Sequence, residues 1–363
     1  MQAQDFIPQS KLGTIDTGKV AWQSPSNIAL VKYWGKKENQ IPANPSISFT
    51  LNNCKTTTSL ECTRKKDSEN KGDFFDFEFY FEGKKKEDFK PKIYTFFERI
   101  EKYCPYLKEY KFTIHSKNSF PHSSGIASSA SGMSALALSI VSIEKELNPT
   151  MSDAHFYRKA SFLARLGSGS ACRSIQGKLV VWGEHAEIEG SSNLYGVEYP
   201  NEVHQVFENY QDTILLVDKG EKKVSSSVGH DLMHNHPFAE ERFKQAHRNL
   251  TALRAIFSSG NLNEFIEIVE NEALTLHAMM MSSNPYFILM KPNTLEIINK
   301  IWAFREATGL PICFTLDAGA NVHVLYPEKN KIEIFQFIEN ELLTYCDKNQ
   351  FISDSVGFGS IRL

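Results

Sequence analysis

The sequence predicts a two-lobed α+β protein, and three observations lead to that prediction. The chain has 363 residues, 41% hydrophobic and 12% aromatic, so it can bury a large core and is longer than one typical domain. Strand and helix patterns are mixed without the strict alternation of a doubly wound parallel sheet. The later part of the chain carries three long helical patterns in succession. We therefore expect two lobes, formed by residues 19–205 and 206–363.

The first lobe is expected to begin with two strands around a loop. Residues 20–51 are rich in strand-forming residues, and the polar–apolar alternation resumes after Pro42 and Pro45. The charged stretch 64–90 is expected to form a surface excursion, in which residues 74–85 show the alternation of a half-buried strand entering a turn. The other expected elements are a helix at 89–104, a strand at 111–115, a long buried helix after the turn at 119–132, a helix capped by Ser152 that reaches Leu166, and a strand within 177–184.

The second lobe is expected to consist of strands and long helices. DTILLVD predicts a strand at 212–218, and the segments ICFTLDAG and NVHVLYP predict a strand, a glycine turn and a second strand. A closing helix and a short strand complete this lobe. Its three long helices are expected at 237–258, 262–281 and 293–308.

Composition excludes several classes of protein. The formal net charge is −3, from 40 basic and 43 acidic residues, which provides no electrostatic footprint for nucleic acid. No run of about 18 apolar residues occurs, and the start lacks the apolar core of a signal peptide. We therefore expect a cytoplasmic protein with no membrane or nucleic-acid partner.

The cysteines and histidines do not predict a metal site. The six cysteines are scattered without CxxC pairs, which favours free thiols over disulfides or zinc ligands. His230, His234 and His236 lie close together, but no cysteine or carboxylate cluster accompanies them at the spacing of a metal site. Solvated loop histidines are the expected explanation.

The most informative motif is NSFPHSSGIASSASG at residues 118–132. Exposed backbone N–H groups and the positive end of a helix dipole make such a turn a phosphate cradle, and its hydroxyls can hold a magnesium ion. The motif is not of the GxxxxGK[ST] type. The alternative is a flexible serine-rich loop, although such loops rarely run straight into a buried helix. The candidate residues are Ser123, Ser124, Gly125, Ser128, Ser129 and Ser131.

A second motif is ARLGSGSACRS at residues 164–174. Its small residues let the backbone approach a ligand closely, and the guanidinium of Arg173 suits a carboxylate because it can form two parallel hydrogen bonds. The alternative is that Arg165 and Arg173 form salt bridges within the core.

Two further motifs carry charged groups. In FTLDAGANVHV, Asp317 ends an apolar strand, where an acid or base is usefully mounted, although Asp is also common in turns for structural reasons. In SPSNIALVKYWGK, Lys32, Tyr33 and Lys36 follow a strand closely. The two lysines either hold a polyphosphate or form a solvated face.

Together these motifs resemble the diphosphomevalonate decarboxylases, a branch of the GHMP family of small-molecule kinases. NIALVKYWGK, NPSISFTL, FPHSSGIASSASG, GSGSACRS and FTLDAGANV occur in the family's order between about residues 25 and 325. The resemblance implies a GHMP fold, with an N-terminal lobe like a domain of a ribosomal protein, a ferredoxin-like C-terminal lobe, and a site between them. It also implies a homodimer.

The resemblance further implies an activity. The family converts 5-diphosphomevalonate and ATP into isopentenyl diphosphate, carbon dioxide, ADP and phosphate, and requires Mg²⁺. Asp317 would orient or deprotonate the C3 hydroxyl, Arg173 would bind the C1 carboxylate, and Lys32 would lie near the reacting hydroxyl. Substrate contacts would come from Tyr33, Lys36, Ser168, Ser170 and Ser226, and the serines of the 123–131 turn would hold the ATP phosphates, with Mg²⁺ bound through those phosphates and by Ser129.

One segment departs from the family pattern. Related bacterial enzymes carry SSRSGM, whose Ser and Arg touch the substrate diphosphate, whereas this chain has SSSVGH at residues 225–230. Ser226 is kept, but Ser227 replaces the arginine and His230 the methionine. The alternatives are therefore a decarboxylase of the 5-monophosphate, a GHMP kinase that does not decarboxylate, and a ligand-binding sensor without activity.

Overall fold

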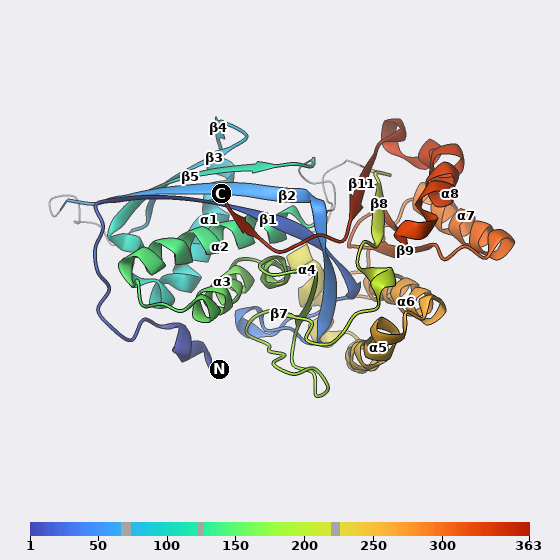
Figure 1. The fold of residues 1–363 in the computed structure, drawn as a ribbon, viewed down its shortest axis with the longest axis horizontal. Helices are drawn as coiled ribbons and strands as arrows, with labels where there is room; N and C mark the ends of the chain where they lie inside the picture. Colours follow the sequence, from blue (N-terminus) through green and yellow to red (C-terminus); the bar gives the residue numbers. More distant parts are fainter. Residues whose placement is uncertain (67–73, 122–125, 219–225) are drawn as a thin grey trace.

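Two β-sheets of different size organise the protein (Figure 1). The computed structural model describes residues 1–66, 74–121, 126–218 and 226–363. A sheet of eight strands forms the N-terminal lobe together with three helices, and a sheet of four strands forms the C-terminal lobe with the long helices of the second half. The architecture is the predicted two-lobed α+β fold.

The large sheet has the order β12-β1-β2-β5-β3-β4, with β6 added to β2 and β7 to β6. Its neighbours pair antiparallel, except that β3 runs parallel to β5. The strands are β1 (Thr17–Val31), β2 (Ser46–Arg64), β3 (Asp76–Phe81), β4 (Lys84–Lys85), β5 (Tyr110–Asn118), β6 (Leu179–Trp182), β7 (Val197–Glu198) and β12 (Ile361–Arg362).

The two longest strands change their burial pattern along their length. The first half of β1 alternates between buried and more exposed residues, whereas every residue from Ser24 to Val31 is buried. β2 shows the reverse, with Ser46–Leu51 buried throughout and alternation afterwards. These buried ends pair with each other, for example Val31 with Ile47. A strand covered on both faces shows no alternation, so the two ends lie where the lobes meet.

Three helices cover one face of the large sheet (Figure 1). The middle one, α2, is buried along most of its length because small residues let it pack between the sheet and its neighbours. Ser152 caps the third helix by accepting a hydrogen bond from the N–H of His155 at 3.2 Å, as predicted. The helices are α1 (Lys90–Ile100), α2 (Ser128–Leu147) and α3 (Asp153–Gly167), and the 3₁₀ helix η6 (Gly169–Ser174) follows α3.

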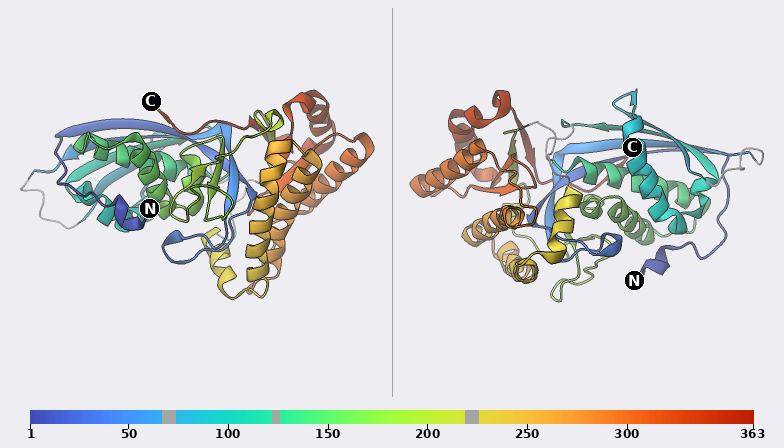
Figure 2. Two further views of the ribbon diagram at one scale, coloured as in Figure 1. Left: turned by 60° about the horizontal axis from the view of Figure 1, so that its bottom comes forward. Right: turned by 180° about the vertical axis from the view of Figure 1, so that it is seen from behind.

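The C-terminal lobe packs long helices against an antiparallel sheet of order β11-β8-β10-β9. Figure 2 shows these helices side by side at the end of the molecule away from α1–α3. The elements are β8 (Gln211–Leu215), β9 (Cys313–Leu316), β10 (Val322–Tyr326), β11 (Phe351–Ser355), α4 (Ser226–Asp231), α5 (Ala239–Ser259), α6 (Leu262–Met281), α7 (Pro292–Thr308) and α8 (Lys331–Phe337). The three predicted long helices are confirmed, with ends shifted by two residues or fewer.

An aromatic cluster closes the junction of the lobes. Phe49 of β2 packs against Phe257 of α5 and Phe265 of α6, with ring centroids about 6.4 and 6.5 Å apart. Tyr210 lies 5.3 Å from Phe265. The junction is therefore a continuous apolar core, which holds the elements of both lobes around any cavity between them.

The end of the chain returns to the large sheet. β12 pairs antiparallel with β1, so that Arg362 faces Trp22. The predicted boundary at residues 205 and 206 falls between β7 and β8 and remains a proposal. All six cysteines are buried free thiols, as predicted. Within the described residues, no helix has the length and apolar character needed to span a bilayer.

Candidate active site

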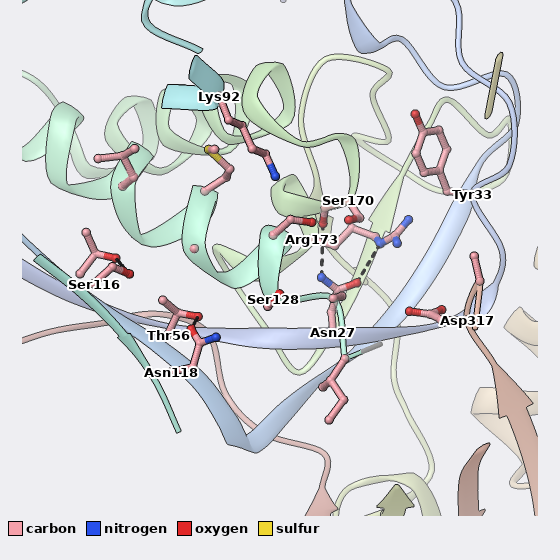
Figure 3. A pocket seen from close by; sticks show the side chains of 18 of the residues that line it. Asn27, Tyr33, Thr56, Lys92, Ser116, Asn118, Ser128, Ser170, Arg173 and Asp317 are labelled. Atoms are coloured by element: carbon pink, nitrogen blue, oxygen red, sulfur yellow. Dashed lines mark hydrogen bonds between the residues drawn. The ribbon is translucent and has the colours of Figure 1, made fainter. Parts of the chain in front are cut away.

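A cavity of about 590 Å³ lies where the lobes meet, and residues from both lobes line it (Figure 3). Asp317, Arg173 and Tyr33 occupy one end, while Lys92, Ser116 and Asn118 lie toward the other. The structure thus brings the predicted acid and the predicted guanidinium to one cavity.

Lys32 and Asp317 form an ion pair across the lobes. Lys32 follows the buried end of β1, and Asp317 follows β9. The Lys32 ammonium lies 3.5 Å from Oδ1 of Asp317, and the two side chains are 2% and 29% exposed. Burial lowers the pKa of Lys32, although the carboxylates of Asp317 and Glu272 oppose this shift. A buried amine and a partly exposed acid therefore meet at the cavity wall.

Arg173 lies in η6 and presents a buried guanidinium to the same cavity. It donates from Nε to Oδ1 of Asn27 at 3.4 Å and from NH1 to the hydroxyl of Ser46. Within the described chain, no carboxylate lies within ion-pair distance of it, and burial lowers its pKa. A desolvated guanidinium with only neutral partners favours an incoming anion.

The lining of the cavity carries more positive than negative charge. Lys32, Lys92 and Arg173 are cationic, and Asp317 is the acid among the described lining residues. The whole chain has a net charge of −3, so this surplus is local. It suits a ligand with several negative charges.

Tyr33 and His230 pack against each other beside Trp182. The rings of Tyr33 and His230 are 4.1 Å apart, and those of Tyr33 and Trp182 are 4.5 Å apart. A Cβ on Gly169 would lie 3.0 Å from the Tyr33 hydroxyl and 2.9 Å from Trp182, so this glycine makes the close approach possible. Burial raises the pKa of Tyr33, which keeps its hydroxyl protonated as a hydrogen-bond donor.

The prediction of solvated loop histidines is wrong for two of the three. His230 is buried on α4, lines the cavity, and accepts a hydrogen bond at Nδ1 from the N–H of Gly35 at 3.0 Å. His236 is buried, with Nε2 3.1 Å from the carbonyl oxygen of Met279. Only His234 is exposed. The reason is that this segment packs on Trp34 and α6 instead of forming an open loop.

The ring of His230 is neutral and carries its proton on one defined nitrogen. Burial lowers its pKa to about 3, so the ring is uncharged near neutral pH. Because Nδ1 accepts the Gly35 N–H, the proton of the neutral ring resides on Nε2.

The serines that the sequence predicted for the site, where the structure describes them, divide into two groups. Ser128, Ser129 and Ser170 line the cavity, and Ser168 lies next to this group with its hydroxyl 3.4 Å from that of Ser129. Ser131 is buried, and its hydroxyl lies 2.6 Å from that of Thr56 in the sheet. The structure therefore brings Ser131 to the sheet and not to the cavity lining.

Several predicted site residues are not among the described residues that line the cavity. Ser123, Ser124 and Gly125 fall outside the described residues. Ser226 begins α4, but its side chain is not described. Lys36 forms an ion pair with Asp231 at 3.3 Å and is absent from the lining of the cavity.

The far end of the cavity contains residues that sequence reasoning missed. Phe79 and Phe81 come from β3, and Phe89 stacks on them with centroids 5.4 and 5.6 Å away. Lys92 of α1 and Asn118 of β5 add polar groups nearby. The alternation at 74–85 predicted a half-buried strand, but nothing local indicated that its phenylalanines would face this cavity.

The donor groups fit a phosphate and a weakly held magnesium ion. The first turn of α2 has no side-chain cap, and Ala127 before it adopts a left-handed conformation (φ 38°), which leaves N–H groups for an anion. Among the described residues, no cluster of three or more His, Cys, Asp or Glu can form a metal cage. Magnesium accepts such a site when phosphates and water supply most of its oxygens.

Comparison with known proteins identifies the family. The model described as "Diphosphomevalonate decarboxylase-like N-terminal domain" matches residues 24–193, and that of the "Mevalonate 5-diphosphate decarboxylase C-terminal domain" matches residues 213–357. The chain belongs to the diphosphomevalonate decarboxylase family. Diphosphomevalonate decarboxylase of Ganoderma lucidum is 29% identical over 340 residues, which are 87% of this chain and 80% of that protein.

Solved structures of the family agree in fold. The mevalonate diphosphate decarboxylase of Staphylococcus aureus is 29% identical, with a TM-score of 0.80 over 96% of this chain and 98% of that one. MDDEF in complex with MVAPP, AMPPCP and magnesium is 26% identical, with a TM-score of 0.80 over 96% of this chain and 99% of that one. The predicted GHMP fold is therefore confirmed.

Proposed function

We propose that this protein converts 5-diphosphomevalonate and ATP into isopentenyl diphosphate, carbon dioxide, ADP and phosphate. The observation that carries the proposal is the cavity that Asp317, Lys32 and Arg173 line together. Its size and its surplus of cations suit two phosphorylated ligands. The family relative MDDEF, described in complex with MVAPP, AMPPCP and magnesium, supports the same ligand classes.

The first proposed step phosphorylates the C3 hydroxyl of the substrate. Asp317 orients this hydroxyl and takes its proton as the oxygen attacks the γ-phosphoryl group, while the bond from the γ-phosphorus to the bridging oxygen breaks and ADP leaves with the electron pair. Lys32, 3.5 Å from Asp317, adds positive charge beside the group in transfer. Phosphoryl transfer needs positioning and charge neutralisation above all, and these two side chains supply both.

The second proposed step releases phosphate and carbon dioxide. The bond between C3 and its phosphorylated oxygen breaks, and the phosphate leaves with the electron pair. The C1–C2 bond then breaks, and its electrons form the double bond between C2 and C3. Arg173 holds the C1 carboxylate in place until it leaves as carbon dioxide. Asp317 passes the proton it took in the first step to the departing phosphate, and the resulting carboxylate stabilises positive charge at C3.

Ser128 and Ser129 would hold the ATP phosphates at the start of α2, and Tyr33 and Ser170 would contact the substrate. Magnesium would be held through the phosphates and by Ser129, and it would neutralise part of the phosphate charge. A homodimeric state and a cytoplasmic location remain predictions from the sequence.

The test is an assay with ATP, Mg²⁺ and 5-diphosphomevalonate labelled at C1. We expect carbon dioxide and ADP in a one-to-one ratio, and we expect Asp317→Asn to lower kcat about 10³-fold or more while the folded protein keeps its Tm. ADP without carbon dioxide would indicate a kinase. Faster turnover of the 5-monophosphate would favour a decarboxylase of the 5-monophosphate. The absence of product from either substrate would favour a ligand-binding sensor without activity.

A further inference from the structure

The backbone of Lys32 is held from the opposite lobe. Its N–H donates to Oε2 of Glu272 on α6 at 2.9 Å, and its carbonyl oxygen accepts from NH2 of Arg242 on α5 at 3.1 Å. Asn44 donates to the same carbonyl oxygen at 2.9 Å. Both polar backbone groups of the residue that carries the cavity ammonium are thus bonded to a single ion pair of the C-terminal lobe.

That ion pair is buried and closed by two hydrogen bonds, although Nε of Arg242 has no hydrogen-bond partner among the described residues. Arg242 and Glu272 are 1% and 0% exposed, and they meet through NH2 and Oε2 at 2.5 Å and through NH1 and Oε1 at 2.9 Å. Asn249 adds a hydrogen bond to Oε1 at 2.6 Å. Buried ion pairs are often no more stabilising than apolar residues of the same volume, so the pair calls for a role beyond stability.

Helix α6, which carries Glu272, also holds the main chain of Asp317. His277 lies on α6, and its Nε2 donates to the carbonyl oxygen of Asp317 at 3.1 Å. Burial lowers the pKa of His277 to about 4, so the ring is neutral and can donate in this way. One rigid helix therefore fixes the main chain of both members of the Lys32–Asp317 pair, although they belong to different lobes.

We propose that Arg242 and Glu272 are positioning residues: they hold the main chain of Lys32 so that its ammonium lies within reach of Asp317, and Glu272 places a buried carboxylate against that main chain. The proposal rests on the proposed function, in which Lys32 adds positive charge beside the phosphoryl group in transfer. Neither residue touches the cavity, so both act through Lys32.

The expected effect on Lys32 has a definite sign. Burial lowers the pKa of Lys32, and the carboxylates of Asp317 and Glu272 raise it, while the charge of Arg173 lowers it. Removing the charge of Glu272 therefore lowers this pKa further, and the activity that needs the ammonium is lost at a lower pH on the alkaline side. The titratable and charged groups around Lys32 are Asp317 on the β9–β10 turn, Glu272 and His277 on α6, Arg242 on α5, Arg173 on η6 and Asp212 on β8.

A matched control lies on the same helix. Glu270 of α6 forms an ion pair with Arg305 of α7, with NH1 and Oε1 2.6 Å apart and NH2 and Oε2 3.0 Å apart, and Trp302 donates to Oε2 at 2.9 Å. This pair is also largely buried but lies within the C-terminal lobe and is absent from the cavity lining. It therefore measures the structural cost of losing an α6 carboxylate.

The experiment compares Glu272→Gln with Glu270→Gln in the decarboxylation assay across pH. We expect Glu272→Gln to lower kcat about 10²-fold with a small change in KM, because misplacement of a group by about 1 Å has an effect of that size. We also expect the alkaline limb of its pH–rate profile, where activity falls as the pH rises, to shift to lower pH. Glu270→Gln should lower Tm by a similar amount and keep the wild-type kcat and the wild-type alkaline limb. If Glu272→Gln keeps the wild-type kcat and alkaline limb, the proposal is wrong.

A second variant covers the case in which Glu272→Gln does not fold. Arg242→Lys keeps the ion pair but cannot bond both Glu272 and the Lys32 carbonyl in the same geometry. We expect kcat to fall while the alkaline limb stays in place, because the charge of Glu272 remains. Unchanged kcat in a folded Arg242→Lys protein would contradict the positioning role.

A measurement without substrate separates this proposal from the proposed function. Titration of the Lys32 ammonium by NMR in protein carrying ¹³C-labelled lysine, assigned with Lys32→Met, reports its charge directly. We expect a lower midpoint in Glu272→Gln than in wild type and Glu270→Gln. An unchanged midpoint would refute the electrostatic part of the proposal, whether or not the wild type releases carbon dioxide.

Discussion

Arg165 and Arg173 lie in the same motif, and both are buried, yet they have different surroundings. Arg165 donates from Nε to the carbonyl oxygen of Leu194 at 2.7 Å and from NH1 to that of Asn39. Arg173 bonds only neutral side chains and faces the cavity. Burial of a guanidinium therefore does not by itself indicate function. The direction of its N–H groups, toward carbonyl oxygens or toward a cavity, separates a structural arginine from a ligand-binding one.

Among the variants that compare two similar residues, the largest effect is expected from exchanging the two arginines for glutamine. Arg173→Gln should lower kcat/KM about 10²–10³-fold, because a desolvated charge partner of the substrate carboxylate is lost. Its Tm should stay the same or rise, since an unpaired buried charge is removed. Arg165→Gln should instead lose about 2–3 kcal/mol of unfolding free energy, because the carbonyl oxygens of Leu194 and Asn39 lose a charged donor. Kinetics and thermal unfolding of both variants check this contrast.

Ligand-dependent unfolding sharpens the same contrast. 5-Diphosphomevalonate at about 100 times its Kd should stabilise wild type and Arg165→Gln by about 2.7 kcal/mol. At the same concentration Arg173→Gln should gain far less. Equal gains in all three proteins would show that Arg173 does not meet the substrate.

His230 and His236 offer a second comparison between a cavity-lining side chain and one that is bonded within the protein, and the expected effect on kinetics is smaller. His230 lines the cavity and carries its ring proton on Nε2, whereas Nε2 of His236 is 3.1 Å from the Met279 carbonyl oxygen. His230→Met keeps the volume but removes the donor, so the KM for the phosphorylated substrate should rise about tenfold with little change in kcat. His236→Gln should change Tm and leave KM alone. A wild-type KM in His230→Met would remove His230 from substrate binding.

His230 also has a stability signature. Its folded pKa is about 3, below the ordinary value of 6.5. Below about pH 6.5 the His230 ring therefore binds a proton in the unfolded chain but not in the folded protein, so the free energy of unfolding falls as the pH drops from 6.5 toward 3. In His230→Met this part of the pH dependence should disappear. Denaturant unfolding at pH 7 and pH 5 measures the difference.

The smallest effect is expected for two serines of α2. Ser129 lines the cavity, whereas the hydroxyl of Ser131 lies 2.6 Å from that of Thr56. Ser129→Ala should raise the KM for ATP about threefold to tenfold, the value of one hydrogen bond. Ser131→Ala should lose about 1 kcal/mol of unfolding free energy with a smaller change in KM. The reverse pattern would show that the cradle is built from the other side of the helix.

The sequence predicted the elements whose signals are local. The periodicity of α5, α6 and α7 and the alternation of β3 are properties of contiguous residues, so their positions could be predicted closely. The charged residues Lys32, Arg173 and Asp317 were also identified, because each lies in a short motif of contiguous residues, and all three line the cavity.

Features that depend on distant partners could not be predicted. The burial of His230 depends on Trp34, and the pairing of Lys36 with Asp231 joins segments almost two hundred residues apart. The bonds of Glu272 to Lys32 likewise arise only when the lobes meet. Single-sequence patterns carry no information on such contacts.

The pairing of β12 with β1 has a consequence for how the protein is made. Arg362 faces Trp22, so 340 residues (362 − 22) separate the two partners. At synthesis rates of about 5–20 residues per second, roughly 17–70 s pass between the synthesis of Trp22 and that of Arg362. During this time the edge of β1 lacks its pairing with β12. An unpaired edge invites association with other chains, so nascent molecules depend on the rest of the sheet, or on a chaperone, until translation reaches β12.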